Sequence, residues 1–410
     1  MRAAAFLYPW DVVGDPDAAR RVADLGVQQV TLAAAYHSTR ALTPRHPRHR
    51  IVTARHSAVL YPSDPERWAG RALRPYRQDW VADPDPFGAA ARALADAGLE
   101  VHSWVVLAHN TRLGTEHPAI AVRNAYGDRY PWAPCIARPE VRAYLCDLAA
   151  EAAVRPGARG TELESCGWYG LAHLHAHDKT CGVPLSGAAQ YLMSLCFCEV
   201  CEADCTALGV PAREVRGAVV RALEPVWAGA HGGGAGEGRA GEWREVERLL
   251  GGELSGLVRR RRDDAARTLR REVVAAVRIA ADDGFRVLLH TDPAGHRCGA
   301  NAGADPADVL AHADGVVVPC TGDDAARTDA LAPFAGVRAR SATLPDTPAS
   351  VVAANLTVVT AMGGRPGSLA ADAAHAAALG ADELRLYHAG LAGDGDLAAV
   401  RRGLAAVRKR

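Results

Sequence analysis

Residues 161–166 read Thr-Glu-Leu-Glu-Ser-Cys, a short strand-like run with carboxylates at alternate positions. It is the fourth of eight such runs, and a segment of helical character separates each run from the next. The predicted strands span residues 3–8, 29–36, 101–109, 161–166, 286–292, 315–320, 337–343 and 383–388. Because eight strands that alternate with helices are the count of a (β/α)8 barrel, we predict an α/β fold of the TIM-barrel type.

Helix start and stop signals support this alternation. Asp85-Pro86 opens a predicted helix over 87–97, because Asp is a good N-cap and Pro is favoured in the first turn. Ser368 is the predicted N-cap of a further helix over 369–379, which Gly380 ends.

The chain is predicted to be a single barrel domain over 1–410 with two insertions. The first, 37–84, is a polar loop rich in His, Arg and Pro that follows the second strand. The second, 167–285, separates the fourth and fifth strands and contains a cysteine cluster, a flexible glycine-rich stretch at 228–241 and a long helix from about 243 to 283. Long insertions in barrels usually surround the active site at the carboxyl ends of the strands.

Charge and composition narrow the classes of function. The chain balances 47 Lys and Arg against 47 Asp and Glu, which argues against broad binding to nucleic acid or an anionic membrane. The basic run at 259–262 is interpreted as a solvated helix face. The apolar run near the N-terminus is too short for a signal peptide, so a cytoplasmic protein is expected, with homo-oligomerisation left open. Ten cysteines there would be free thiols or metal ligands.

The fourth strand supplies the first candidate for chemistry. Alternation places Glu162 and Glu164 on one side of the strand and Leu163 on the other. Leu163 suits the apolar layer between barrel and helices, so both glutamates should point into the barrel. Glu164 lies nearer the mouth, and burial beside Trp168 and Tyr169 would raise its pKa and make it a proton donor.

A structural interpretation competes with the catalytic one. Either glutamate could instead pair with an inward arginine, for which the candidates are Arg338, Arg340 and Arg385. This interpretation is favoured for Glu162 and disfavoured for Glu164.

The end of the fifth strand offers a second carboxylate. His290 and Asp292 share a face there, and Asp292 would complete a glycosidase-type pair with Glu164. Glu162 is the alternative partner. Asp292 also precedes a proline, so a turn-forming role is open as well.

Aromatic and polar residues recur at the strand ends. Aromatic faces stack on sugars, while His, Asn and Asp bond hydroxyl groups, so together they predict a pocket for a polar ligand. The candidate substrate-binding residues are Trp10, Asp11, Tyr36, His37, His109, Asn110, Trp168, Tyr169, His290 and Tyr387.

Three cysteines lie within six residues, as Cys196-x-Cys198-x-x-Cys201. A tetrahedral structural zinc requires four ligands, so this segment supplies three. Spacing leaves the fourth open among Cys135, Cys166, Cys181 and Cys205, and buried unliganded thiols are the alternative. The histidine-rich tract at 173–177 could hold a second metal or form a surface loop.

The order of these features resembles a known family. Over about residues 120–205 the chain resembles the zinc-containing β-galactosidases of glycoside hydrolase family 42 and related barrel hydrolases. The shared features are a cysteine before Ala137-Arg-Pro-Glu-Val-Arg142, a fourth strand that ends in glutamate, and then Cys-x-Cys-x-x-Cys. The resemblance implies Glu164 as acid/base, a carbohydrate or glycoside substrate, and structural zinc on Cys135, Cys196, Cys198 and Cys201.

Two departures from this family affect its chemistry. Leu163 stands where the family has Asn, and the predicted seventh strand lacks the nucleophilic glutamate, with Asp346 as a late substitute. The leading hypothesis is a glycosidase that uses Glu164 with Asp292 or Glu162. A metal-dependent sugar isomerase, epimerase or lyase and a non-catalytic sugar-binding protein are the alternatives.

Overall fold

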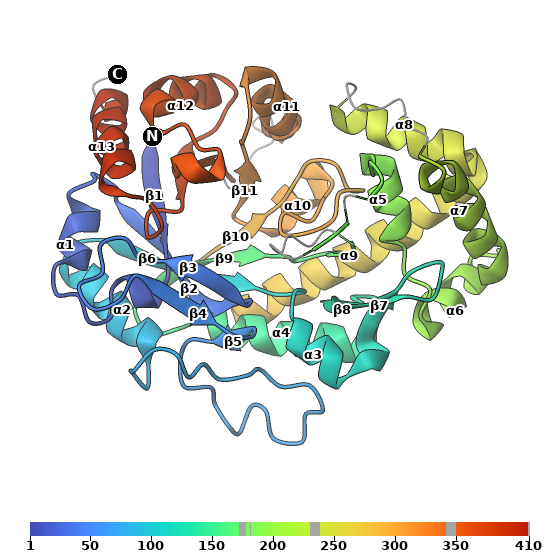
Figure 1. Ribbon diagram of the computed structural model, residues 1–410, viewed down its shortest axis with the longest axis horizontal. Helices are drawn as coiled ribbons and strands as arrows, with labels where there is room; N and C mark the ends of the chain where they lie inside the picture. Colours follow the sequence, from blue (N-terminus) through green and yellow to red (C-terminus); the bar gives the residue numbers. More distant parts are fainter. Residues whose placement is uncertain (172–177, 181, 230–237, 342–349, 409–410) are drawn as a thin grey trace.

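The computed structural model describes residues 1–171, 178–180, 182–229, 238–341 and 350–408. Eight parallel strands form its centre and helices surround them (Figure 1). The strands are β1 (Arg2–Leu7), β2 (Gln29–Tyr36), β6 (Glu100–Val106), β9 (Ala158–Glu164), β10 (Arg286–His290), β11 (Gly315–Pro319), β12 (Val351–Thr357) and β13 (Glu383–Tyr387).

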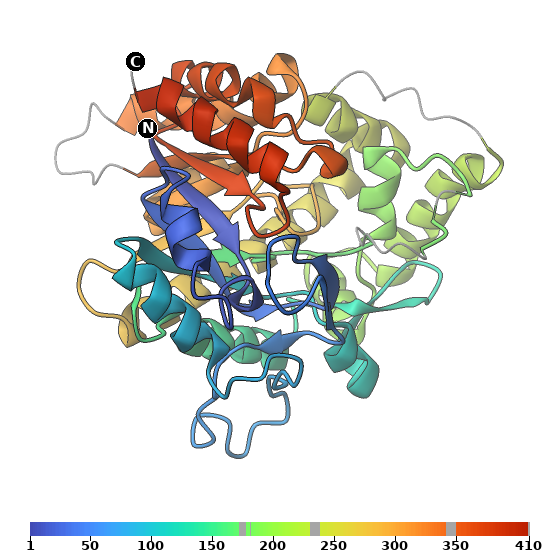
Figure 2. The same cartoon turned by 60° about the vertical axis from the view of Figure 1, so that its left-hand side comes forward.

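The sheet closes on itself. β1 pairs with β13 on one side, where Ala5 is opposite Leu386, and with β2 on the other, where Leu7 is opposite Leu32. The predicted (β/α)8 barrel is therefore confirmed. Figure 2 shows the helices around it, which are α1 (Ala18–Ala23), α2 (Pro86–Asp96), α4 (Pro139–Ala153), α9 (Gly252–Ala280), α10 (Pro306–His312), α11 (Asp324–Ser341), α12 (Leu369–Ala378) and α13 (Asp394–Arg408).

The predicted seventh strand at 337–343 is wrong. Residues up to Ser341 are the end of α11, and the seventh strand is β12, which begins ten residues later. Ala and Arg favour helix, so an alternating Arg-Ala-Arg-Ser continues the helix already started at Asp324. Arg338 consequently pairs with Asp382 on the surface at 2.7 Å, outside the barrel interior. Asp346 lies outside the described residues.

Four helices form a lobe between β9 and β10, to the right in Figure 1. They are α5 (Gly187–Met193), α6 (Glu199–Ala207), α7 (Ala212–Trp227) and α8 (Gly238–Leu250). Leu192, Val219, Val246 and Val258 belong to a hydrophobic cluster of this lobe and α9. The histidine tract at 173–177 and most of the glycine-rich stretch lie outside the described residues.

One prediction for this region is wrong and a second holds only in part. The expected long helix is divided into α8 and α9 at Gly251, whose φ of 76° is accessible to glycine and interrupts the helix. The basic run is a solvated face only in its first half: Arg259 and Arg260 are exposed, whereas Arg261 and Arg262 are 6% and 2% exposed. The two buried arginines face the lobe, where Arg261 donates to the carbonyls of Cys196 and Cys201.

Shorter elements extend the loops at the carboxyl ends of the strands. A hairpin of β3 (Thr39–Leu42) and β4 (Ile51–Ala54) follows β2, and β5 (Ala58–Val59) pairs antiparallel with the end of β2. After β6 come the short helix α3 (Thr111–Glu116) and the ribbon of β7 (Ala121–Arg123) and β8 (Arg129–Pro134). Among the described residues, no helix has the length and apolar character needed to span a bilayer.

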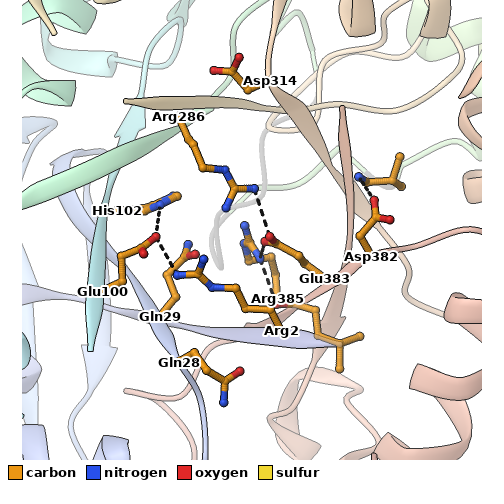
Figure 3. A network of polar contacts seen from close by, with 12 residues as sticks. Arg2, Gln28, Gln29, Glu100, His102, Arg286, Asp314, Asp382, Glu383 and Arg385 are labelled. Atoms are coloured by element: carbon orange, nitrogen blue, oxygen red, sulfur yellow. Dashed lines mark hydrogen bonds and ion pairs between the residues drawn. The ribbon is translucent and has the colours of Figure 1, made fainter. Parts of the chain in front are cut away.

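The amino end of the barrel interior is polar. Glu383 bridges Arg286 at 3.1 Å and Arg385 at 2.9 Å, while Glu100 contacts Arg2 at 2.7 Å and His102 at 2.9 Å (Figure 3). Branched apolar residues more commonly fill this space in TIM barrels. Each of these charges has a partner of opposite sign or a hydrogen-bonding neighbour, which offsets the cost of burial.

Candidate active site

Glu164 is the last residue of β9 and lies at the mouth of the barrel, 8% exposed. Its Oε2 accepts a hydrogen bond of 2.9 Å from the Trp104 indole nitrogen. Burial raises the pKa of Glu164, and the nearby His290 and the Trp104 bond offset only part of that increase. A carboxyl group with these properties can hold a proton and donate it to a bound molecule.

Tyrosines surround Glu164. The hydroxyl of Tyr8 donates to that of Tyr36 at 3.1 Å, and the two rings meet edge-to-face at 4.9 Å. Burial raises the pKa of Tyr387 to about 12, with the negative charge of Glu164 acting in the same direction. These phenols are therefore protonated near neutral pH and are hydrogen-bond donors.

These residues open into a cleft of about 1730 Å³ at the carboxyl ends of the strands. Its size exceeds that of a monosaccharide pocket, since small-molecule sites typically measure about 300–1,000 Å³. The predicted site residues that line it are Tyr36, His37, His109, Glu164, Tyr169, Asp292 and Tyr387. His37 stacks on His109 at 4.9 Å, and His109 meets Tyr169 at 4.0 Å, so aromatic rings form one wall.

Other predicted binding residues do not line this cleft. Asn110 accepts from the backbone of Leu113 at 3.0 Å and so caps α3. Trp168 donates to the carbonyl of Arg262 at 2.9 Å, and Trp10 stacks behind Tyr8 at 4.4 Å. Each follows a strand end in the sequence, but the local backbone directs its side chain toward the core.

Asp11 also lies outside the cleft. Its Oδ2 accepts from the backbone nitrogen of Tyr8 at 2.8 Å. Burial raises the pKa of Asp11 to about 7, against the opposing effect of that bond and of Arg45. A carboxyl group held beneath Tyr8 supports the position of the Tyr8 ring and is not exposed to a ligand in the cleft.

Glu162 lies one layer below Glu164 and is fully buried. Its Oε1 accepts from Arg385 at 2.5 Å and from Thr31 at 3.0 Å, and its Oε2 lies 3.3 Å from His290. Burial alone would raise the pKa of Glu162, but Arg385 and His290 outweigh it and lower the pKa well below its ordinary value. Arg385 is one of the three arginines that the sequence suggests as inward partners of a glutamate.

Asp292 follows β10 at the cleft wall and is bound by two guanidinium groups. Arg239 of α8 donates to both carboxylate oxygens, at 2.8 and 2.9 Å, and Arg297 donates at 3.2 Å. Arg239 also contacts Asp329 at 2.5 Å, while Arg297 contacts Glu242. The carboxylate therefore joins the lobe to the barrel.

The seventh strand supplies no carboxylate to the cleft. β12 reads Val-Val-Ala-Ala-Asn-Leu-Thr, without Asp or Glu. The sequence predicts a seventh strand without glutamate at residues 337–343. The seventh strand is in fact β12, and β12 contains no glutamate either.

Some residues that line the cleft are not indicated by the sequence patterns. Arg40, Gln190, Arg297 and Asn301 line the cleft from segments that connect the barrel strands, and the alternation within those strands does not predict their positions. Tyr8 ends the first strand in the run Tyr-Pro-Trp, and strand-end position was a signal that could have selected it.

The four cysteines implied by the family resemblance meet in space. The sulfur atoms of Cys135, Cys196, Cys198 and Cys201 all lie within 4.8 Å of one another and are buried. Cys135 Sγ is 3.6 Å from Cys201 Sγ and 3.7 Å from Cys198 Sγ. Regular tetrahedral coordination with bonds of about 2.3 Å gives sulfur separations of about 3.8 Å, so the donor set fits a metal ion.

Comparison with known proteins supports the fold. No protein-family model and no curated protein sequence matches the chain. Among solved structures, α-L-fucosidase isoenzyme 2 from Paenibacillus thiaminolyticus matches with a TM-score of 0.58 at 12% identity, over 100% of this chain and 49% of that one. The PgaB (BpsB) glycoside hydrolase domain from Bordetella bronchiseptica matches with a TM-score of 0.52 at 15% identity, over 98% of both chains.

The fold is that of glycoside hydrolase barrels. The resemblance to such barrels that the sequence indicated is confirmed at this level, but these matches do not single out family 42. This barrel chain spans about half the length of the fucosidase it matches.

Proposed function

We propose that this barrel is a glycoside hydrolase in which Glu164 is the general acid. The observation that carries the proposal is the place of Glu164, buried at the floor of an aromatic cleft where β9 ends. Catalytic groups in TIM barrels lie at this face, and glycosidases protonate the leaving oxygen with a carboxyl group of raised pKa.

The residues around Glu164 have distinct tasks in this proposal. Trp104 fixes one carboxyl oxygen and leaves the other to face a glycosidic oxygen. Tyr169 and His109 provide ring faces for the sugar, and Tyr36 and Tyr387 provide hydroxyl donors. Proton donation by such a positioned group typically contributes about 10²–10⁴-fold to the rate.

Asp292 is the second carboxylate that we assign, as base or nucleophile. It lines the same cleft as Glu164, which supports this choice over Glu162, whose oxygens contact Arg385, Thr31 and His290 below the cleft. Asp292 must exchange a guanidinium contact for water or substrate in order to react. Arg239 already contacts Asp329, so it would keep a carboxylate partner after release.

A structural zinc on the cysteine cluster is the second part of the proposal. Cys135 precedes α4 of the barrel, whereas Cys196 and Cys198 precede α6 and Cys201 lies in its first turn, so a bound zinc would join barrel and lobe. Arg261, which donates to two carbonyls of the cluster, would offset the negative charge of four thiolates. Metal analysis should find one zinc per chain, lost in Cys135→Ser and retained in Cys205→Ser; Cys205 is buried outside the cluster.

Turnover of a broad panel of 4-nitrophenyl glycosides tests the catalytic proposal. Wild-type protein should hydrolyse at least one glycoside, and Glu164→Gln should lower its kcat by about 10²–10⁴-fold while retaining fold and metal. Glu66→Gln, at an exposed glutamate outside the cleft, is the matched control. Full activity in Glu164→Gln would contradict the assignment. Sugar binding without turnover would indicate a binding protein, and activity that needs a second, exchangeable metal would indicate an isomerase, epimerase or lyase.

A further inference from the structure

We infer that the cleft takes an anionic glycan, an oligosaccharide that bears carboxylate or sulfate groups, and that Arg40 on the β3–β4 hairpin binds the anionic group. The inference rests on the proposed function and adds to it the class of substrate.

The hairpin segment carries an unusual concentration of positive charge. Residues 37–56 contain five Arg and four His without any Asp or Glu, and no acidic residue occurs between Asp24 and Asp64. The whole chain is balanced at a formal net charge of zero. A local excess of one sign on a balanced chain is expected where a ligand of the opposite sign is bound.

The pairing of β3 with β4 directs part of this charge into the cleft. Ala41 and Val52 are opposite each other and buried, so their face of the hairpin packs against the barrel. Arg40 and Thr53 form the next pair and face the other way. Both line the cleft, as does Arg55 just beyond β4.

Of the two hairpin-segment arginines that line the cleft, Arg40 and Arg55, only Arg40 is unpaired within the described residues. Arg45 donates to the carbonyls of Ala389 and Ala392, and Arg55 contacts Asp79 at 2.6 Å. Within the part of the chain that the structure describes, Arg40 has no hydrogen-bonding or ionic partner, and it is exposed. Its guanidinium is therefore available to a ligand without first breaking an internal contact.

The rest of the cleft lining does not cancel this charge. Its acidic residues are Glu164, whose pKa is raised by burial, and Asp292, which two arginines already bind. At the opposite wall, Arg297 is matched by Asp292 and Glu242. Unmatched positive charge is thus found at the hairpin wall.

The chemistry of guanidinium groups selects the ligand class. Arginine binds carboxylate, sulfate and phosphate oxygens through paired N–H donors, and such charge-assisted bonds are stronger than those to neutral hydroxyl groups. A neutral sugar would leave the Arg40 charge without a counterpart. An acidic sugar whose scissile bond lies at Glu164 would place its neighbouring residues along the hairpin wall of a cleft that is large enough for several sugars.

Binding to matched pairs of probes tests the inference without requiring turnover. Trisaccharides of glucuronate, galacturonate and mannuronate are each compared with their neutral methyl esters, and a sulfated chondroitin tetrasaccharide with its unsulfated form. Titration calorimetry on the Glu164→Gln protein keeps the ligands intact. At least one anionic member should bind at least about tenfold more tightly than its neutral partner, because one charge-assisted contact has this magnitude.

Variants of Arg40 locate the effect. Arg40→Gln should remove the preference for the anionic member, Arg40→Lys should retain part of it, and Arg213→Gln, at an exposed arginine on α7, should leave it unchanged. Equal binding of all pairs, or a preference that survives Arg40→Gln, would overturn the inference. Duplex DNA that binds through Arg40 while the glycans do not would also overturn it. Failure of wild-type turnover, in contrast, would reject the hydrolase proposal alone.

Discussion

Glu162 and Glu164 lie on the same face of β9, about 6.6 Å apart along the strand, yet their surroundings are opposite. Glu162 is bound by Arg385 and a histidine in the closed interior, which lowers its pKa. Glu164 faces tyrosines and one indole donor at the cleft, and burial raises its pKa. One strand therefore carries a charged carboxylate that stabilises the barrel and, two residues later, a carboxyl group suited to proton transfer.

The two pKa values shift in opposite directions because of neighbouring positive charge, since both side chains are buried. The amino end of the barrel contains Arg286 and Arg385, each paired with Glu383 (Figure 3). Arg385 also pairs with Glu162. Among the described residues Glu164 forms no ion pair, and the neutral indole of Trp104 donates a hydrogen bond to it. Burial with a cation favours the charged form, while burial among aromatic rings favours the neutral one.

Glu164→Gln removes the proposed proton donor and should have the largest effect. We expect kcat to fall by about 10²–10⁴-fold, because the amide cannot protonate the leaving oxygen. The thermal midpoint should stay the same or rise, since the folded state no longer buries an ionisable group with a penalised charge. Steady-state kinetics and calorimetry measure both. A large loss of stability would place Glu164 with Glu162 as a structural residue.

Arg385→Met removes the cation that Glu162 and Glu383 share in the barrel interior. Removing one partner of a buried ion pair costs about 3–5 kcal/mol, so we expect a decrease of that size in the free energy of unfolding, measured with urea. The double variant Arg385→Met/Glu162→Gln should recover part of it, because one unpaired charge is gone. Losses that simply add would show that the two side chains are not coupled.

The pH dependence should separate the two glutamates. In the proposed role Glu164 acts in its protonated form, so its raised pKa should hold kcat through the ordinary glutamate value of 4.5 and let it fall only at higher pH. The lowered pKa of Glu162 has the opposite consequence: its contribution to stability is present above 4.5 and is lost as pH falls through the lower folded value. Glu162→Gln should therefore flatten the acid-side decrease in unfolding free energy. An activity limb at 4.5 would contradict the role of Glu164.

Trp104→Phe should have the smallest effect and test what sets the Glu164 pKa. The indole bond stabilises the carboxylate, so its loss should move the alkaline limb of kcat to higher pH while lowering kcat severalfold through poorer positioning. Profiles of kcat against pH measure both changes. A shift of the limb to lower pH would show that Trp104 stabilises the neutral form.

Local patterns were sufficient for most of the barrel. Seven of the eight strands were placed because short apolar runs bounded by turns have one plausible conformation. The seventh was missed because the Val337 segment alternates like a strand but continues a helix that began at Asp324. Period-two alternation also placed both β9 glutamates inside the barrel without any knowledge of their partners.

Local sequence patterns are enough to predict the barrel, the faces of its strands and three closely spaced cysteines, because these features depend on neighbours within a few residues. Only the tertiary structure shows that Cys135 joins them and that Arg239 binds Asp292 from 53 residues away. It also shows that Arg261 is buried and that the side chains of Asn110 and Trp168 turn away from the cleft. It also separated the roles of Glu162 and Glu164, since Arg385 comes from the last strand, 223 residues along the chain from Glu162. Closure of the barrel brings the Arg385 charge to Glu162 and not to Glu164, and no local sequence pattern indicates which glutamate receives it.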